Sequence, residues 1–223
     1  MFTRREVGSL ILAAGAASLA ARVPVAYAQQ RPTLNIAVDN LWATMAPING
    51  ISTTSRRIFP NFYDTLVERD YINDENGLIF APKLATKWEQ NGNVWTFTLR
   101  EGVKFHDGSE MTAEDAVFSL SAERLWGEKP FEPRGKTFAA GFKRVEATGK
   151  YTFELETVNP DPNIPSKLTG YIGFVVPKKY YLDVGVDAFG QKPIGTGPYK
   201  VTTFRSGEVM VLDAFDDYWA GPP

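Results

Sequence analysis

The sequence contains no cysteine and a single histidine, His106, among its 223 residues. Without cysteine there can be no disulfide bond, no thiolate metal ligand, no cysteine nucleophile and no lipidated cysteine anchor. One histidine without any cysteine also cannot supply the nitrogen and sulfur ligands of a zinc site. We therefore predict that the chain holds no metal ion and uses no cofactor.

An excess of positive charge is also missing, since the formal net charge is −2. Without the three arginines and one glutamate of residues 1–28, the net charge becomes −4. A mildly acidic chain with no basic cluster is not expected to bind nucleic acid, because that binding depends on neutralising phosphates. Apolar residues make up 43% of the sequence and aromatic residues 13%, which is enough to bury the core of one or two domains.

The N-terminal apolar run is short. Val7–Ala21 has 15 residues, fewer than the roughly 20 that span a bilayer. The run follows Thr3-Arg4-Arg5 and precedes Ala26-Tyr27-Ala28, a small-x-small pattern that signal peptidase cleaves. We therefore predict a signal peptide at residues 1–28 and a periplasmic location, with an uncleaved membrane anchor as the alternative. The paired arginines resemble a twin-arginine signal, which favours export by that route.

Several segments alternate between apolar and polar residues, as half-buried strands do. Thr33–Val38 is the first of them. Asn91-Gly92 marks a β-hairpin, because asparagine and glycine both accept positive φ angles. The inward side chains of the strand after this turn are expected to be Trp95, Phe97 and Leu99. A second hairpin is expected around Thr148–Lys150, so the patterns together predict mixed α and β structure with antiparallel pairing.

Residues 105–120, FHDGSEMTAEDAVFSL, are typical of a turn that leads into a helix. Asp107-Gly108 is a turn pair, and Thr112 can cap a helix whose first turn is acidic. This helix would carry apolar side chains on two nearly opposite faces, one with Ala113, Ala116, Val117 and Leu120 and the other with Phe118, Ala122 and Leu125. We therefore expect it to pack on two sides.

His106 is interpreted as a structural residue. A catalytic triad needs a nucleophile, a base and an orienting group within hydrogen-bond reach, and no G-x-S-x-G sequence lies near this histidine.

Two other motifs are also interpreted as structural. The stretch GTGPYK at 195–200 lacks the G-K-[ST] pattern of a phosphate-binding loop. Asp70–Gly77 lacks the full calcium-loop register, which favours a solvated turn.

Two long blocks carry a family resemblance: PKLATKWEQNGNVWTFTLREGVKFHDGSEMTAEDAVFS, and later PIGTGPYKV followed by SGEVMVLDAFDDYWAGPP. They resemble the family 5 solute-binding proteins of ABC importers, the peptide, oligopeptide and nickel binding group. The resemblance implies an α/β, periplasmic-binding-protein-like type II two-lobed fold with an extra small α+β domain. It assigns residues 29–63 to the start of lobe I, 64–185 to the inserted small domain and 186–223 to the return into lobe I. The second lobe would lie beyond these residues.

The same resemblance implies a function. The chain is expected to capture a peptide or a related small solute as a monomer and to deliver it to an ABC permease in the inner membrane, without catalysing a reaction. The loop after the first strand would face the ligand. The expected ligand contacts are Asn40, Trp42, Ser52, Thr53, Thr54 and Tyr171. Helix capping by the serine and threonine side chains and core packing of Trp42 are the alternative interpretations. The alternative functions are a secreted hydrolase of the glycosidase or esterase type and a free-standing periplasmic interaction module.

Overall fold

The computed structural model describes residues 31–223, so the predicted signal peptide at residues 1–28 lies outside the described residues. Residues 38–223 form one compact unit, and residues 31–37 belong to a separate one. The predicted strand at Thr33–Val38 is wrong, because these residues form no strand, and Leu34 and Ile36 are 80% and 74% exposed. Alternation gives a segment an apolar face, but a strand also needs a neighbour that satisfies its backbone hydrogen bonds.

The larger unit is built around a four-stranded antiparallel sheet. Its order is β3 (Ala85–Asn91), β4 (Val94–Leu99), β6 (Thr152–Thr157) and β5 (Phe142–Gly149). Two further antiparallel pairs stand apart from this sheet: β1 (Val67–Arg69) with β2 (Phe80–Pro82), and β7 (Tyr199–Arg205) with β8 (Val209–Ala214). The predicted domain division at residues 64 and 185 stays a prediction.

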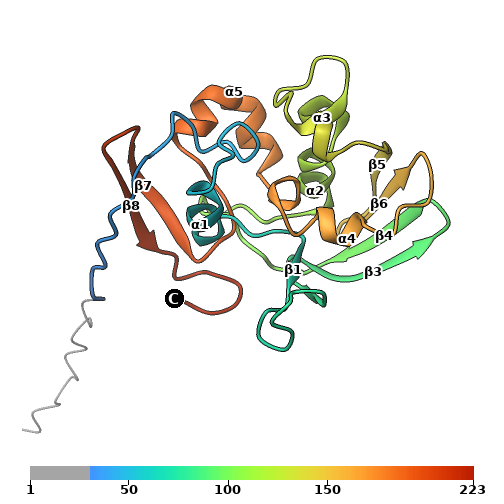
Figure 1. Cartoon of the computed structure of the whole chain (residues 1–223), viewed down its shortest axis with the longest axis horizontal. Helices are drawn as coiled ribbons and strands as arrows, with labels where there is room; N and C mark the ends of the chain where they lie inside the picture. Colours follow the sequence, from blue (N-terminus) through green and yellow to red (C-terminus); the bar gives the residue numbers. More distant parts are fainter. Residues whose placement is uncertain (1–30) are drawn as a thin grey trace, which may run out of the picture. The chain divides into compact units, whose positions relative to one another are not determined.

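The helices are short: α1 (Ser55–Ile58), η1 (Phe59–Asn61), α2 (Ala113–Ser119), the π-helix η2 (Ala122–Trp126), α3 (Gly135–Phe138), α4 (Ile164–Lys167), η3 (Tyr171–Gly173) and α5 (Lys178–Gln191). Gly185, with a φ of 78°, interrupts α5. Figure 1 shows α1 and α2 between the four-stranded sheet on one side and the β7–β8 hairpin on the other. Within residues 31–223, none of the helices combines the length and the apolar character needed to cross a membrane. The mixed arrangement agrees with the predicted α/β class.

Both predicted hairpins are present. In the first one Asn91 pairs with Val94, so the turn residues are Gly92 and Asn93, one position later than expected. Gly92 supplies the positive φ angle, 62°, that this tight turn requires. The three predicted inward side chains of β4 are buried, with exposures of 7% for Trp95, 0% for Phe97 and 2% for Leu99. The second hairpin joins β5 to β6, as expected.

Helix α2 lies between two apolar clusters. The Asp115 carboxylate accepts the backbone N–H of Thr112 at 2.9 Å, which fixes the start of the helix as a capping box does. One face of the helix joins a cluster that includes the sheet residues Phe97 and Phe153. Phe118, on the other face, belongs to a second cluster that includes Phe59, Tyr63 and Phe189. Packing on two sides is confirmed, but the predicted second face is right only for Phe118. Helix α2 ends at Ser119, and Leu125, in η2, belongs to the first cluster.

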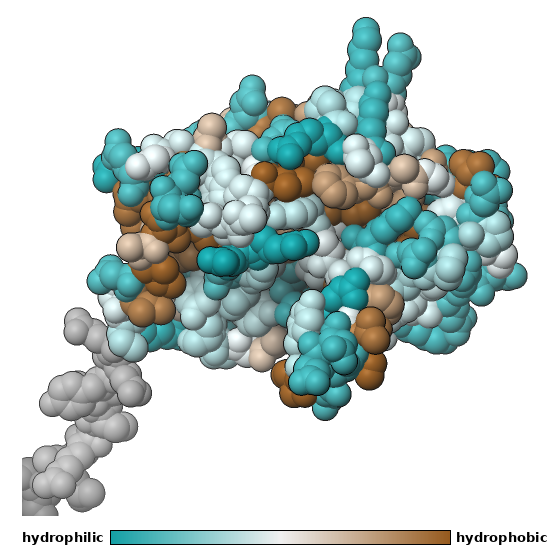
Figure 2. All heavy atoms as spheres, viewed as in Figure 1, coloured by the Kyte–Doolittle hydropathy of each residue, from teal (hydrophilic) through white to brown (hydrophobic). Residues whose placement is uncertain are grey.

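The loop between β1 and β2 projects from the unit (Figure 1). Asp70 accepts the backbone N–H groups of Ile72 and Asn73, and Asp74 accepts further N–H groups later in the same loop. These bonds hold a turn, as predicted for Asp70–Gly77. The loop also exposes large apolar side chains, of which Ile72 is 96% exposed. Figure 2 shows the corresponding apolar surface on the projecting loop.

The connector Gly195–Gly197 packs against the backbone of Phe62. A Cβ atom at Gly195 would lie 2.0 Å from the carbonyl oxygen of Phe62, and one at Gly197 would lie 2.6 Å from its carbonyl carbon. Only glycine allows this close approach. The glycines of the GTGPYK sequence are therefore explained by packing.

His106 ties the turn before α2 to this connector. Its Nε2 atom lies 3.0 Å from the carbonyl oxygen of Gly197, and its Nδ1 atom accepts the backbone N–H of Gly195 at 3.2 Å. Because a carbonyl only accepts and an N–H only donates, the ring must be neutral with its proton on Nε2. Asp107 instead accepts bonds from Ser109, so the two neighbours do not form a catalytic pair. The structural interpretation of His106 is supported.

We predict that His106 makes the fold less stable in acid. Burial lowers the pKa of His106 from 6.5 to about 4, against the opposing hydrogen bond to Gly197. The unfolded chain therefore binds more protons between these pH values, and stability is lost as the pH falls from 6.5 towards 4. The full loss corresponds to about 3 kcal/mol.

Urea unfolding of the wild type and of His106→Gln, followed from pH 8 to pH 4, measures this effect. The unfolding free energy of the wild type minus that of His106→Gln should decrease as the pH falls, because only the wild type has the titrating histidine. The two proteins have the same carboxylates, so these cancel in the difference. A difference that stays constant over the whole range would contradict the prediction.

Candidate functional site

Three of the predicted contact residues, Ser52, Thr54 and Tyr171, lie in one neighbourhood. The Tyr171 hydroxyl donates to the carbonyl oxygen of Ser52 at 2.8 Å, across 119 positions of sequence. The same hydroxyl lies 3.5 Å from Oγ of Ser55. Tyr171 thus holds the residues just before α1 against the start of η3.

The Ser52 side chain holds the turn that leads into α1. Its Oγ atom accepts the backbone N–H groups of Thr54 and Ser55, both at 3.2 Å. The backbone N–H of Ser52 in turn donates to Oγ of Ser55 at 2.8 Å. These bonds satisfy N–H groups that a helix start leaves without partners. The N-cap residue of α1 is Thr54, which makes no capping hydrogen bond with its side chain. The Ser52 hydroxyl is occupied by local bonds, and a ligand contact by this residue stays a prediction.

The other predicted contacts lie around this group. The Thr54 hydroxyl donates to the Asp39 carboxylate at 3.2 Å. Asn40 and Thr53 are exposed. Trp42 is half-buried, with its ring 6.3 Å from that of Phe59 in the second apolar cluster. Core packing therefore accounts for part of the Trp42 ring, and ligand contacts by these residues stay predictions.

A cavity of about 740 Å³ adjoins Tyr171. Its aromatic lining residues are Tyr63, Tyr71, Phe138, Tyr171 and Phe174, and its charged ones are Arg56, Asp64, Glu68, Arg69, Lys83 and Lys167. A cavity of this volume is large enough for a small organic ligand or a short peptide. The lining offers rings for apolar parts of a ligand and several positive charges for an anionic group.

Of the predicted contacts, only Tyr171 lines this cavity. Arg56 is the most informative residue that the sequence analysis missed. It lies directly after Ser55, and its exposed side chain lines the cavity, whereas that of its neighbour Arg57 does not. The available signal was the pair of arginines in the short helix α1. Local sequence does not distinguish which of the two faces the cavity.

Asp64 lies at the buried end of the lining and is 2% exposed. Its carboxylate accepts hydrogen bonds from Thr196 at 3.1 Å, Tyr218 at 3.3 Å and the Trp219 indole at 2.9 Å. Lys83 lies 3.7 Å away. Burial raises the pKa of Asp64 above its ordinary value, although the Trp219 bond and the Lys83 charge act in the opposite direction. Asp64 therefore joins the cavity wall to the segment that follows β8.

The remaining acid of the lining, Glu68, forms an ion pair with Lys83 at 3.1 Å. Within residues 31–223, no group of three or more histidine, aspartate or glutamate side chains is arranged to hold a metal ion. His106 does not belong to the cavity lining. The chemistry that the site offers is recognition of charge and of apolar surface.

Comparison with known proteins adds a family match. Residues 80–223 match the family described as bacterial extracellular solute-binding proteins, family 5 middle. The structure of MoaA from A. tumefaciens R10 in complex with mannopinic acid is similar, with a TM-score of 0.72 and 29% identity over 84% of this chain. AppA from Bacillus subtilis, solved with a nonapeptide, has a TM-score of 0.68 and 26% identity over 85% of this chain.

A regulator is also among the relatives. The HTH-type transcriptional regulator SgrR of Pectobacterium atrosepticum is 32% identical over 66% of this chain. The chain spans 24% of that regulator and 37% of the MoaA and AppA chains. The similarity thus covers most of this chain but only 24–37% of each relative.

We predict that Asp64→Ala destabilises the fold by about 3 kcal/mol, because the buried Thr196, the half-buried Tyr218 and Trp219, and Lys83 lose their shared partner. Asp187→Ala is the matched control, since Asp187 is exposed. Its effect should stay within about 0.5 kcal/mol. Urea unfolding monitored by tryptophan fluorescence measures both changes. Equal effects of the two substitutions would show that the Asp64 cluster does not stabilise the fold.

Proposed function

The chain belongs to the bacterial extracellular solute-binding proteins of family 5, and we propose that it forms one wall of a cleft that captures a small solute carrying a carboxylate. In this proposal the chain acts in the periplasm as the substrate-binding part of an ABC importer and passes the solute to a permease in the inner membrane. It acts as a monomer after export by the twin-arginine route. The ligand is bound without being chemically altered.

The observation that carries the proposal is the charge of the cavity beside Tyr171. Arg56 is exposed at this cavity, and Arg69, Lys83 and Lys167 add three further positive charges. A guanidinium group recognises a carboxylate through two parallel hydrogen bonds. Lys83 pairs with both acids of the lining and Lys167 pairs with Asp161, whereas Arg69 bonds only to uncharged groups. Arg56 and Arg69 are therefore the charges that leave the cavity with a positive excess.

The ligands seen with similar proteins have matching chemistry. MoaA was solved with mannopinic acid and AppA with a nonapeptide. Both ligands carry a carboxylate on a larger polar or apolar body. A carboxylate-bearing solute of the opine acid or peptide class is therefore the proposed substrate class of this chain.

The alternative functions find less support in the chemistry of the site. A hydrolase needs an acid or base free to transfer a proton to a substrate, whereas Asp64 accepts three hydrogen bonds and Glu68 pairs with Lys83. A DNA-binding role like that of the regulator SgrR is disfavoured by the formal net charge of −2.

Arg56→Ala should weaken binding of mannopinic acid or of a tripeptide by roughly tenfold, the usual value of one charged hydrogen-bonding group. Titration of the isotope-labelled full chain by NMR measures this change and tolerates weak affinity. Tyr171→Phe should also weaken binding, because the ring stays in place but the hydroxyl that orders Ser52 is lost.

Arg57→Ala is the matched control. Arg57 is a neighbour on α1 that is also exposed but does not line the cavity, so its removal should change the affinity less than about twofold. A loss as large as that of Arg56→Ala would mean that only the overall charge matters. The absence of binding of both carboxylate ligands to the wild type would reject the proposed substrate class.

A further inference from the structure

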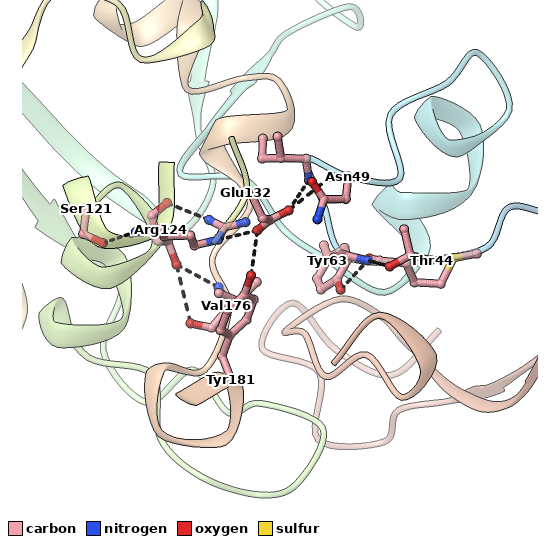
Figure 3. Close-up of polar contacts among 12 residues, drawn as sticks. Thr44, Asn49, Tyr63, Ser121, Arg124, Glu132, Val176 and Tyr181 are labelled. Atoms are coloured by element: carbon pink, nitrogen blue, oxygen red, sulfur yellow. Dashed lines mark hydrogen bonds and ion pairs between the residues drawn. The ribbon is translucent and has the colours of Figure 1, made fainter. Parts of the chain in front are cut away.

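A buried carboxylate binds the backbone of the segment that precedes Ser52. Oε2 of Glu132 accepts the backbone N–H of Ile48 at 2.8 Å and that of Asn49 at 3.2 Å. Glu132 lies more than 80 residues later in the chain, between η2 and α3. Figure 3 shows its carboxylate between the Asn49 segment on one side and Arg124 and Tyr181 on the other.

The second oxygen of the same carboxylate faces the core. Oε1 of Glu132 lies 2.8 Å from Nε of Arg124 and accepts the Tyr181 hydroxyl at 3.1 Å. The Arg124 and Glu132 side chains are both 0% exposed. Arg124 also donates to the carbonyl oxygen of Ser119 at 2.6 Å. A buried ion pair is stable only when such bonds replace the lost water, so its geometry is tightly set.

The segment is also anchored on either side of Ile48 and Asn49, the two residues that bond to Glu132. Before them, the Tyr63 hydroxyl donates to the carbonyl oxygen of Met45 at 3.0 Å, as Figure 3 also shows. After them, the Tyr171 hydroxyl holds the carbonyl oxygen of Ser52 at 2.8 Å. Residues 48–52 therefore run between a buried carboxylate and a tyrosine of the cavity lining, and α1 with Arg56 follows directly.

We propose that Glu132 is a positioning residue for the ligand-contacting segment, and that its carboxylate sets the conformation from which residues 52–56 reach the ligand. This inference rests on the proposed function for its effect on affinity, but its structural part does not. Glu132 itself is buried and does not line the cavity, so it acts through Ile48 and Asn49. Ligand affinity would then depend on a charge that never touches the ligand.

Glu132→Gln is the first test. Glutamine keeps the shape of the side chain, but its single oxygen cannot accept from all four donors that the carboxylate binds. Its NH₂ group, itself a donor, would face either the two backbone N–H groups or Arg124 and Tyr181. Amide hydrogen exchange at Ile48 and Asn49 should become faster by roughly 10- to 100-fold, as expected for the loss of one or two charged hydrogen bonds. Amides of β4 and β6 should keep their exchange rates. The affinity for mannopinic acid should fall about tenfold.

A milder variant and a control keep the test valid if Glu132→Gln does not fold. Tyr181→Phe removes only one donor to Oε1 and should accelerate the same amides to a smaller degree. Ser119→Ala is the matched control. Ser119 is 0% exposed and its hydroxyl accepts the N–H of Val176 at 2.9 Å, but its side chain does not bond to the 48–52 segment. It should lower the melting temperature without changing exchange at Ile48 and Asn49.

Chemical rescue separates positioning from general stability. Glu132→Ala leaves the Arg124 guanidinium, the Tyr181 hydroxyl and two N–H groups around an empty carboxylate position. Formate should restore slow exchange at Ile48 and Asn49, whereas chloride at the same ionic strength should not. Restoration of ligand affinity by formate would support the full proposal.

The outcomes are distinct. Faster exchange spread evenly over β4, β6 and the 48–52 segment, or unchanged exchange in that segment, would overturn the positioning role. Local acceleration with unchanged affinity for mannopinic acid would also overturn it. If the wild type binds neither mannopinic acid nor a tripeptide, the proposed substrate class fails, and the exchange and formate experiments still decide whether Glu132 positions the segment.

Discussion

Burial of two carboxylates is the constraint on which the arrangement of this chain depends. A carboxylate without water must have its lone pairs satisfied by donors, and one residue's own neighbours seldom supply enough of them. Glu132 therefore gathers Ile48, Asn49, Arg124 and Tyr181, and Asp64 gathers Lys83, Thr196, Tyr218 and Trp219. Each cluster joins segments that are far apart in sequence. The cavity lies beside one cluster, and the segment leading to it rests on the other.

The apolar scaffold explains why these clusters can be rigid. Helix α2 is buried on two faces, so it links the cluster around the four-stranded sheet to the aromatic cluster around Phe59 and Tyr63. His106 adds a neutral bridge to the glycine connector, which packs directly on Phe62. For the proposed function, a wall that is already ordered would save the free energy that ordering on ligand binding costs.

Local signals predicted much of the fold and a smaller part of the site. The hairpin at Asn91-Gly92, the cap at Thr112 and the two faces of α2 depend on neighbours a few residues away, and they were predictable for that reason. Thr33–Val38 has the alternation of a strand but forms none, because pairing depends on a distant partner. In the site, Ser52 and Tyr171 were predicted and meet each other, whereas Arg56, Asp64 and Lys83 were not predicted to line a cavity.

The sequence by itself determined the family, the absence of thiol chemistry, both hairpins and the start of α2, since these follow from residue types and short-range spacing. Only the tertiary structure decided which cations face the cavity, that His106 is held neutral by two backbone groups, and that Glu132 supports Ile48 and Asn49. The physical reason is that a hydrogen bond between residues more than 80 positions apart leaves no periodic trace in the sequence. The sequence does not show whether a glutamate is buried or exposed, because this depends on donors that distant segments bring to it.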